Sequence, residues 1–323
     1  MQLVIIYRGI DSIKLLETWA APFLVVMGLA LLAWAYVKAD GFGPMLAAKS
    51  AFDPGGEKEG QLMAYFLPGL TGMVGFWATL SLNIPDFTRY AKTQRDQALG
   101  QALGLPLFMT LFAFIGVAVT SATVSIYGEA IPDPTELAGR MGGGIGVMVA
   151  LAALTVATLS TNIAANVVSP ANAIMNLAPR RATFRIGGFI TAAIGAVILP
   201  WKLIESTDGY IFTWLIGYSA LLGPIGGIVI ADYFLIRRTN VNLQDLYQRS
   251  GEYWYSGGFN PVAVIALVLG VLPNIPGFLF EAGFTESAPE AFQTIYTFAW
   301  FVGFFISGAV YTAGMKMRGA PAS

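Results

Sequence analysis

Long apolar stretches alternate with short polar connections from one end of the chain to the other. A helix of about 20 apolar residues is long enough to cross the hydrocarbon core of a bilayer. The pattern therefore predicts one all-α membrane domain, residues 1–323, with eight spans. Two of the stretches are longer than one crossing needs, so we expect tilt or breaks in them. The expected spans are 16–37, 62–84, 100–126, 143–177, 184–203, 209–236, 260–281 and 291–315.

The basic residues fall unevenly on the two sides of this arrangement. Most of the 18 Lys and Arg lie in the connections on the side that also holds both chain ends. Multi-pass membrane proteins concentrate these residues in their cytoplasmic loops. We therefore expect both termini in the cytoplasm, and the protein in a cell membrane (plasma or inner membrane).

Composition narrows the class of protein further. Hydrophobic residues make up 56% of the chain and charged residues only 11%, whereas soluble domains carry about 25% charged residues. The expected solvent is thus a lipid bilayer, and the net charge of −1 gives no sign of nucleic-acid binding. Cysteine and histidine are absent, which removes disulfides, thiolate catalysis and the commonest zinc ligands. No phosphate loop or nucleophile–base set is present, so we expect neither an enzyme nor a bound cofactor.

The fourth expected span carries a cluster of polar side chains. Thr158, Asn162 and Asn166 recur every four residues and so share one helix face. Polar groups at membrane depth mark a substrate or ion path, and Asn166 offers the donor and acceptor that suit an amide-like heterocycle edge. Ser160 and Thr161 face elsewhere, with oxygens that suit a hard cation such as Na⁺. In the alternative reading, the hydroxyls bond to carbonyls one turn earlier and the asparagines bridge helices.

The second expected span contains Pro68 and several glycines in its first half, which weaken a helix there. Broken helices at membrane depth line cavities and point to transporter sites. Trp77 then lies away from the interfacial belt, where its indole offers a flat face for stacking a planar ligand. In the alternative reading, the glycines permit close helix packing and Trp77 fills space against lipid or core.

Three acids near span ends have a simpler explanation than function. Asp86 lies close to Arg89, and Asp232 lies close to Arg237 and Arg238, so we expect local ion pairs or helix caps. Glu17 lies similarly at the start of the first span. These acids are therefore left out of the expected site.

Four stretches of the chain carry the motifs of one transporter family. They are RGIDSIKLLE at residues 8–17, FWATLSLNIPDFTR at 76–89, SPAN with NLAPRR at 169–181, and GPIGGIVIADY at 223–233. Together they resemble the nucleobase:cation symporter-1 family, which includes hydantoin, allantoin, uracil and cytosine permeases. The resemblance covers essentially the whole chain.

The resemblance implies a LeuT-like helical transporter of twelve spans, ten of which form a five-plus-five inverted repeat. The eight spans expected here match the family's fifth to twelfth helices. The resemblance thus implies a C-terminal fragment that lacks the first four spans, and the short apolar run at residues 1–6 looks like the end of a helix. In the family, the first four spans supply an opposing aromatic, a glutamine pair and further sodium ligands. We therefore expect the chain to need them as a partner.

The resemblance also implies which residues form the site. The family has a tryptophan that stacks on the planar substrate, an asparagine that bonds its amide edge, and a sodium site of one carbonyl and two hydroxyls. The resemblance implies Trp77 and Asn166 as substrate residues, and the Ala157 carbonyl with the hydroxyls of Ser160 and Thr161 as Na⁺ ligands. Phe76, beside Trp77, and Asn162, on the same face as Asn166, complete the expected substrate residues.

The expected function is cation-coupled import of a planar nucleobase or of a hydantoin- or allantoin-like compound. Na⁺ is the expected coupling ion, and H⁺ is the alternative. Two other functions stay open: a non-transporting remnant or subunit that needs a separate N-terminal part, and an amino-acid permease of the same fold. Trp77 and Asn166 favour a flat heterocycle over a zwitterion. Ala173 stands where allantoin- and uracil-type members often have an acid, which weakens any choice of substrate.

Overall fold

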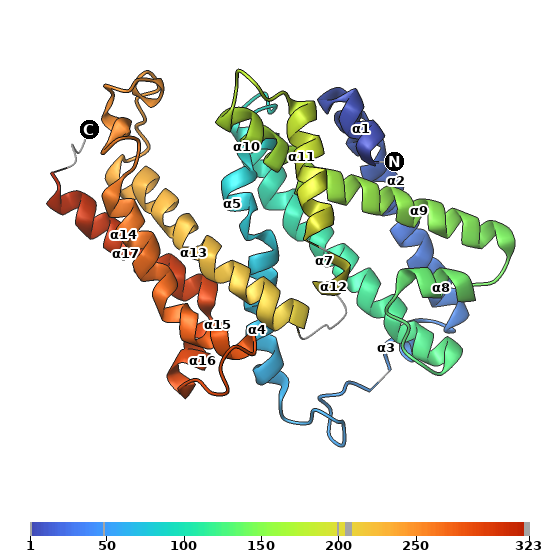
Figure 1. Cartoon of the computed structure of the whole chain (residues 1–323). Coiled ribbons are helices and arrows are strands. Elements are labelled where there is room, and N and C mark those ends of the chain that lie inside the picture. Colours follow the sequence, from blue (N-terminus) through green and yellow to red (C-terminus); the bar gives the residue numbers. More distant parts are fainter. Residues whose placement is uncertain (1, 48, 199, 204–208, 320–323) are drawn as a thin grey trace. The chain divides into compact units, whose positions relative to one another are not determined.

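Helices form nearly all the regular structure in the computed structural model, which describes residues 2–47, 49–198, 200–203 and 209–319 (Figure 1). Within these residues there is one isolated antiparallel bridge, between Ser256 and Phe259, and no longer strand. The expected all-α class is confirmed. Met1, and residue 199 near the end of the expected span 184–203, lie outside the described residues. The chain divides into two compact units, and each is described by itself.

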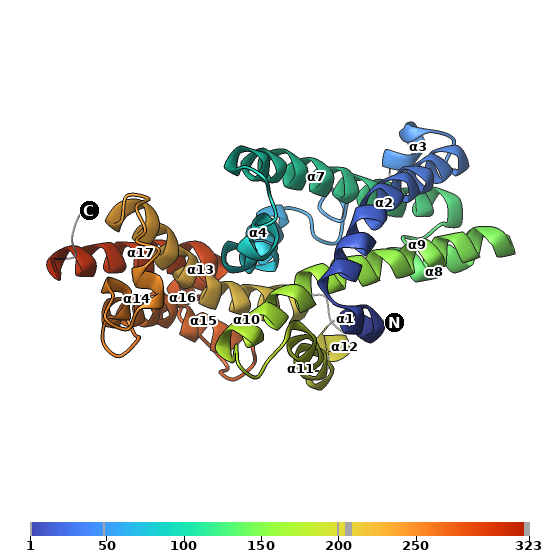
Figure 2. The same ribbon diagram turned by 90° about the horizontal axis from the view of Figure 1, so that it is seen from above.

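Unit 1 comprises Met1–Glu57 and Pro85–Ile198. Its long helix α2 (Ile10–Lys38) packs against α7 (Gln94–Tyr127) and α9 (Gly144–Ile163) (Figure 2). Buried alanines on α2 and α7 permit their close approach. The other helices of unit 1 are α1 (Gln2–Arg8), α3 (Phe42–Leu46), α6 (Pro85–Thr88), α8 (Pro134–Arg140), η1 (Ala164–Val168), α10 (Ser169–Leu177) and α11 (Phe184–Val197).

Unit 2 comprises Lys58–Ile84 and Leu199–Ser323. Its central helix α13 (Ile216–Ile230) packs against α17 (Ala299–Met317) and against α4 (Leu62–Ala78) (Figure 1). The other helices of unit 2 are α5 (Leu80–Asn83), α12 (Pro200–Leu203), η2 (Gly209–Leu215), η3 (Ala231–Ile236), η4 (Asp245–Tyr247), η5 (Glu252–Trp254), α14 (Pro261–Val271), η6 (Leu272–Asn274), α15 (Ile275–Glu281) and α16 (Glu290–Thr297).

Five continuous helical segments of the described chain are long and apolar enough to cross a membrane. They are Asp11–Lys38, Gln94–Tyr127, Gly144–Leu177, Gly209–Ile236 and Pro261–Glu281. Helices α16 and α17 pass the same test together, although they bend by 87° at a short break. Helices α4 and α11 coincide with expected spans but are shorter. The count of eight spans therefore stays a prediction.

Local capping explains where several of these helices begin and end. The side chains of Thr93, Thr183 and Asn260 each accept a hydrogen bond from a backbone N–H in the first turn of α7, α11 and α14. Such caps satisfy amides that have no partner within the helix. Pro261 follows Asn260 at the first helical position, where its missing N–H is not needed. Gly128 ends α7 in the left-handed conformation that glycine adopts readily.

Helix α4 differs from the expectation drawn from its sequence. It continues through Pro68 and ends at Ala78, so the break expected in its first half is wrong. The interruption comes directly after Trp77, where the short helices α5 and α6 follow. Gly75 serves close packing instead, because a Cβ there would collide with the hydroxyl of Ser219 on α13, whereas a Cβ on Gly69 would meet open space. For Gly75, the alternative reading of the sequence is confirmed.

The contact between α13 and α17 is also made at positions that carry little side chain. A Cβ on Gly223 would collide with the carbonyl oxygen of Trp300, and a Cβ on Gly303 would collide with the ring of Pro224. Ser307, which is fully buried, donates its hydroxyl to the Pro224 carbonyl at 2.8 Å. The two backbones therefore approach closely along this interface, as small residues allow in membrane proteins.

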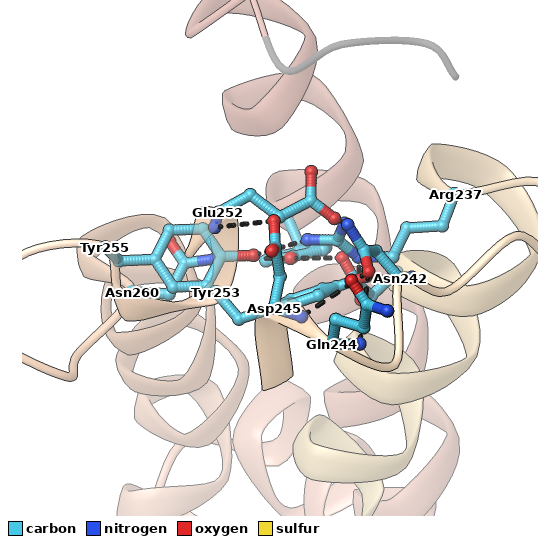
Figure 3. A network of polar contacts seen from close by, with 10 residues as sticks. Arg237, Asn242, Gln244, Asp245, Glu252, Tyr253, Tyr255 and Asn260 are labelled. Atoms are coloured by element: carbon cyan, nitrogen blue, oxygen red, sulfur yellow. Dashed lines mark hydrogen bonds and ion pairs between the residues drawn. The ribbon is translucent and has the colours of Figure 1, made fainter. Parts of the chain in front are cut away.

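Arg237 organises the polar loop that connects η3 to α14 (Figure 3). Its Nε atom donates to Asp232 Oδ2 at 3.0 Å, Nη1 to Glu252 Oε1 at 3.0 Å and Nη2 to the Tyr255 hydroxyl at 2.7 Å. The Tyr311 hydroxyl of α17 donates to the other Asp232 oxygen at 2.7 Å. Burial alone would lower the pKa of Arg237, but the charge of Asp232 and its hydrogen bond outweigh burial and raise that pKa. The ion pair expected for Asp232 is confirmed.

Replacing Arg237 by Met is expected to destabilise unit 2 by about 2 kcal/mol, because it removes the charged hydrogen-bond donor shared by two partly buried carboxylates. The Arg237 side chain is 11% exposed. Thermal unfolding of the purified protein measures the loss. The matched control is Arg238→Met, because the neighbouring Arg238 is exposed and forms no ion pair among the described residues. Equal melting temperatures for the two variants would contradict this role.

Candidate functional site

Asn162 and Asn166 form a pair on one helix face, as their spacing predicts. Asn166 Nδ2 donates a hydrogen bond to Asn162 Oδ1 at 2.7 Å. Asn162 lies in the last turn of α9, and Asn166 lies in the π-helix η1 that continues it. Neither Asn166 Oδ1 nor Asn162 Nδ2 has another hydrogen bond to a described residue. The pair therefore presents one free acceptor and one free donor, which is the complement of an amide edge.

Thr158, on the same face, behaves differently. Its hydroxyl donates to the Leu154 carbonyl one turn earlier, at 2.9 Å. For this residue, the alternative reading drawn from the sequence is confirmed. Its hydroxyl proton is therefore engaged within the helix, while the two asparagines keep free polar atoms.

Ser160 points to another helix of unit 1. Its Oγ donates a hydrogen bond to Glu17 Oε2 of α2 at 2.6 Å, and Ser160 is 6% exposed. The second carboxylate oxygen, Glu17 Oε1, is buried and has no hydrogen-bond partner within the described part of the chain. A buried carboxylate oxygen without a partner costs free energy unless a cation or a proton accompanies it. Ser160 and Glu17 thus bring together two kinds of oxygen that suit a hard cation.

Glu17, an acid left out of the expected site, lies inside α2 and accepts the hydrogen bond of Ser160. From the sequence, it is expected only at the start of the first span. In the structure, the preceding basic residue on this helix, Lys14, places its Nζ 3.9 Å from the centre of the Tyr90 ring. The sequence contains one sign that Glu17 needs a partner on another helix, because no basic residue follows it for more than two helical turns.

The other expected sodium ligands lie on the same helix as Ser160. Ala157 is half-buried and lines a cavity of about 400 Å³ within unit 1, whose wall also includes Gly28 and Phe112. Thr161 is exposed. Ala157 precedes Ser160 by three residues and Thr161 by four, so all three lie on one side of α9. No cluster of three or more acidic side chains that could hold a metal ion occurs among the described residues.

The two expected aromatic residues lie in the last turn of α4, in unit 2. Trp77 is 37% exposed and Phe76 is 47% exposed. Their rings meet edge to face, with centroids 5.4 Å apart and planes at 81°. Trp77 thus keeps more than a third of its surface exposed beside Phe76. The expected site residues thus belong to both units, the aromatic pair to unit 2 and the asparagine pair with Ser160 to unit 1.

The sequence of the chain is similar to those of known permeases over nearly its whole length. Residues 1–303 match the family model described as permease for cytosine/purines, uracil, thiamine, allantoin. The chain is 49% identical over 320 residues to the purine-uracil permease NCS1 of Arabidopsis thaliana, an alignment that covers 98% of the chain and 52% of that protein. It is 38% identical over 324 residues to the allantoin permease of Bacillus subtilis, covering 100% of the chain and 63% of that protein. The chain thus spans between half and two thirds of the length of these relatives.

A hydantoin permease and a solved structure extend the comparison. The hydantoin permease of Microbacterium maritypicum is 32% identical over 300 residues, which cover 88% of the chain and 58% of that protein. The inward-facing conformation of Mhp1 matches 98% of the chain and 64% of its own length, with a TM-score of 0.68 and 25% identity. The helical fold of a LeuT-like transporter, expected from the motifs, is confirmed.

Proposed function

Because the chain belongs to the family of permeases for cytosine/purines, uracil, thiamine and allantoin, we propose that it forms part of a cation-coupled importer of a planar heterocycle. The family and the long apolar helices make it a multi-pass membrane protein. Its relatives are named as permeases for purine and uracil, for allantoin and for hydantoin. These compounds share a flat ring with adjacent N–H and C=O groups.

The asparagine pair carries the substrate part of the proposal. The bond between Asn166 Nδ2 and Asn162 Oδ1 leaves Asn166 Oδ1 as an acceptor for a ring N–H and Asn162 Nδ2 as a donor to a ring carbonyl. Trp77, with Phe76 beside it, supplies the stacking face. Neither residue type provides the charges that the carboxylate and ammonium of an amino acid need, which argues against the amino-acid permease.

The Ser160–Glu17 contact supports the cation part of the proposal. We place Na⁺ at the Ala157 carbonyl and the hydroxyls of Ser160 and Thr161, with the Glu17 carboxylate adding negative charge. Bound Na⁺ favours the conformation that accepts substrate, so its gradient drives uptake. In this proposal both termini are cytoplasmic and the remaining part of the site comes from a segment outside residues 1–323. A remnant or an isolated subunit would bind neither ligand.

Uptake competition tests this function in proteoliposomes that contain the full-length protein. With an inward Na⁺ gradient, we expect unlabelled uracil, allantoin or hydantoin to reduce uptake of radiolabelled uracil or allantoin. Leucine and alanine are expected to have no effect, because neither the asparagine pair nor Trp77 offers a partner for their charges. A choline gradient of equal size is the control for sodium coupling. Competition by the amino acids would overturn the heterocycle assignment, and absence of any uptake would favour the non-transporting remnant.

A further inference from the structure

The segment that follows the Trp77 helix is held by a side chain of α10. Asn172 Nδ2 donates a hydrogen bond to Asp86 Oδ1 at 2.9 Å, and Asn172 is 3% exposed. Arg89 Nη2 lies 3.5 Å from the same oxygen, which confirms the local ion pair expected from the sequence. That ion pair is satisfied within the segment itself. The buried amide of Asn172 therefore adds a tertiary contact that charge neutralisation does not require.

The same segment also contacts α2. Lys14 Nζ lies over the ring of Tyr90, 3.9 Å from its centre. Lys14 precedes Glu17 by one helical turn, while Asn172 lies on α10, which continues α9 and η1 without interruption. Residues 86–90 therefore touch both of the helices whose side chains meet in the Ser160–Glu17 hydrogen bond.

A short covalent connection links this segment to the aromatic residues. Helix α4 ends one residue after Trp77, and only the turn at Thr79, helix α5 and Ile84 separate it from Pro85. Pro85 and residues 86–90 after it are therefore tied covalently to the C-terminal end of α4 by six residues, Thr79 to Ile84.

We propose that the Asp86–Asn172 hydrogen bond is a positioning contact that couples sodium binding beside Ser160 to the helix that carries Trp77. This inference deepens the proposed function and rests on it. Asp86 and Asn172 touch neither substrate nor ion. They hold the segment that follows α4 in the chain against the helices that carry Ser160 and Glu17, and through this segment the two ligands favour the same conformation.

Exchanging the two side chains gives a matched set of variants. Asn172→Asp alone brings two carboxylates together and breaks the contact by repulsion. The double variant Asp86→Asn/Asn172→Asp restores an amide-to-carboxylate bond with the roles reversed. Asp86→Asn alone keeps an amide-to-carbonyl bond and is the conservative control if Asn172→Asp folds poorly.

Amide hydrogen exchange read by mass spectrometry measures the coupling without a known substrate. The full-length protein is compared in NaCl and in choline chloride, through peptides that cover residues 62–83 and residues 151–166. In the unaltered protein, we expect NaCl to slow exchange in both segments. Asn172→Asp is expected to keep the response at 151–166 and to reduce the response at 62–83 about fivefold. The double variant is expected to recover it.

The possible outcomes distinguish failure of the coupling from failure of the proposed sodium site. A response at 62–83 that is unchanged in Asn172→Asp, or lost there and not recovered in the double variant, overturns the coupling. A sodium response at 151–166 that never reaches 62–83 in the unaltered protein overturns the coupling alone. Absence of any sodium response at 151–166 in the unaltered protein overturns the sodium site itself, and the coupling with it.

Discussion

Replacing Asn166 by Ala in the full-length protein is expected to weaken substrate binding about 10- to 100-fold. The substitution removes the free acceptor Oδ1 and also releases Asn162, whose carbonyl loses its donor. A heterocycle bound there would leave its N–H without a partner in a site shielded from water, which costs about 1–3 kcal/mol for each lost group. Trp77→Ala is expected to have a similar result, because stacking on a base-like ring contributes about 1–3 kcal/mol. Equilibrium binding of radiolabelled uracil or allantoin measures both variants.

Thr158→Val is the matched control for Asn166→Ala. It alters the same helix face two turns earlier, but its hydroxyl already bonds to the Leu154 carbonyl, so near-normal affinity is expected. Near-normal affinity in Asn166→Ala would show that the asparagine pair bridges helices and does not bind the substrate. A loss in all three variants would indicate damage to the fold.

Glu17→Gln is expected to raise the half-saturating sodium concentration about tenfold or more. The substitution keeps an oxygen that accepts the Ser160 hydrogen bond but removes the negative charge that offsets the cation. Bonds to charged groups are roughly twice as strong as neutral ones. The double variant Ser160→Ala/Thr161→Ala is expected to raise the same concentration, because it removes both hydroxyl ligands. Sodium-dependent uptake, measured over a range of NaCl at constant ionic strength, gives these values.

Asp11→Asn is the control for Glu17→Gln, because it removes one negative charge from the same helix at a distance from the proposed sodium site. Asp11 is an exposed acid in the first turn of the same helix α2, and we expect it to leave the sodium dependence unchanged. If Glu17→Gln and the Ser160/Thr161 double variant also left it unchanged, sodium would bind elsewhere. Uptake driven equally well by a proton gradient in choline would then favour H⁺ as the coupling ion.

The apolar helices could be placed from the sequence because a segment in lipid must satisfy its own backbone hydrogen bonds. Length and hydropathy therefore suffice to locate a helix such as α7 or α9. The interruption of α4 could not be placed, because the effect of Pro68 and the glycines on a helix depends on which residues of other helices pack against them. Gly75 lacks a side chain to make room for Ser219, a residue 144 positions away, and no local pattern contains that information.

The candidate site was predictable only where its residues share one helix. Asn162 and Asn166 lie four residues apart, and that spacing alone brings their side chains together. The π-helix η1 around Asn166 was not foreseen, although such turns are frequent at functional sites. Glu17 was left out because its place at the start of a span gave no sign of a partner on another helix. Its actual partner, Ser160, is reached only when α2 packs on α9, and helix packing depends on shape along the whole contact.

The glycine-lined contact between α13 and α17 has a consequence for how unit 2 holds together in lipid. Lipid tails are as apolar as leucine, so burying a hydrocarbon surface against another helix gains little there. Cohesion then comes from dispersion forces, which decline steeply with small gaps between atoms. Where Gly223 meets the Trp300 carbonyl, one added methyl group would separate the backbones along several turns. This interface therefore tolerates a change of surrounding lipid better than a change of one carbon atom within it.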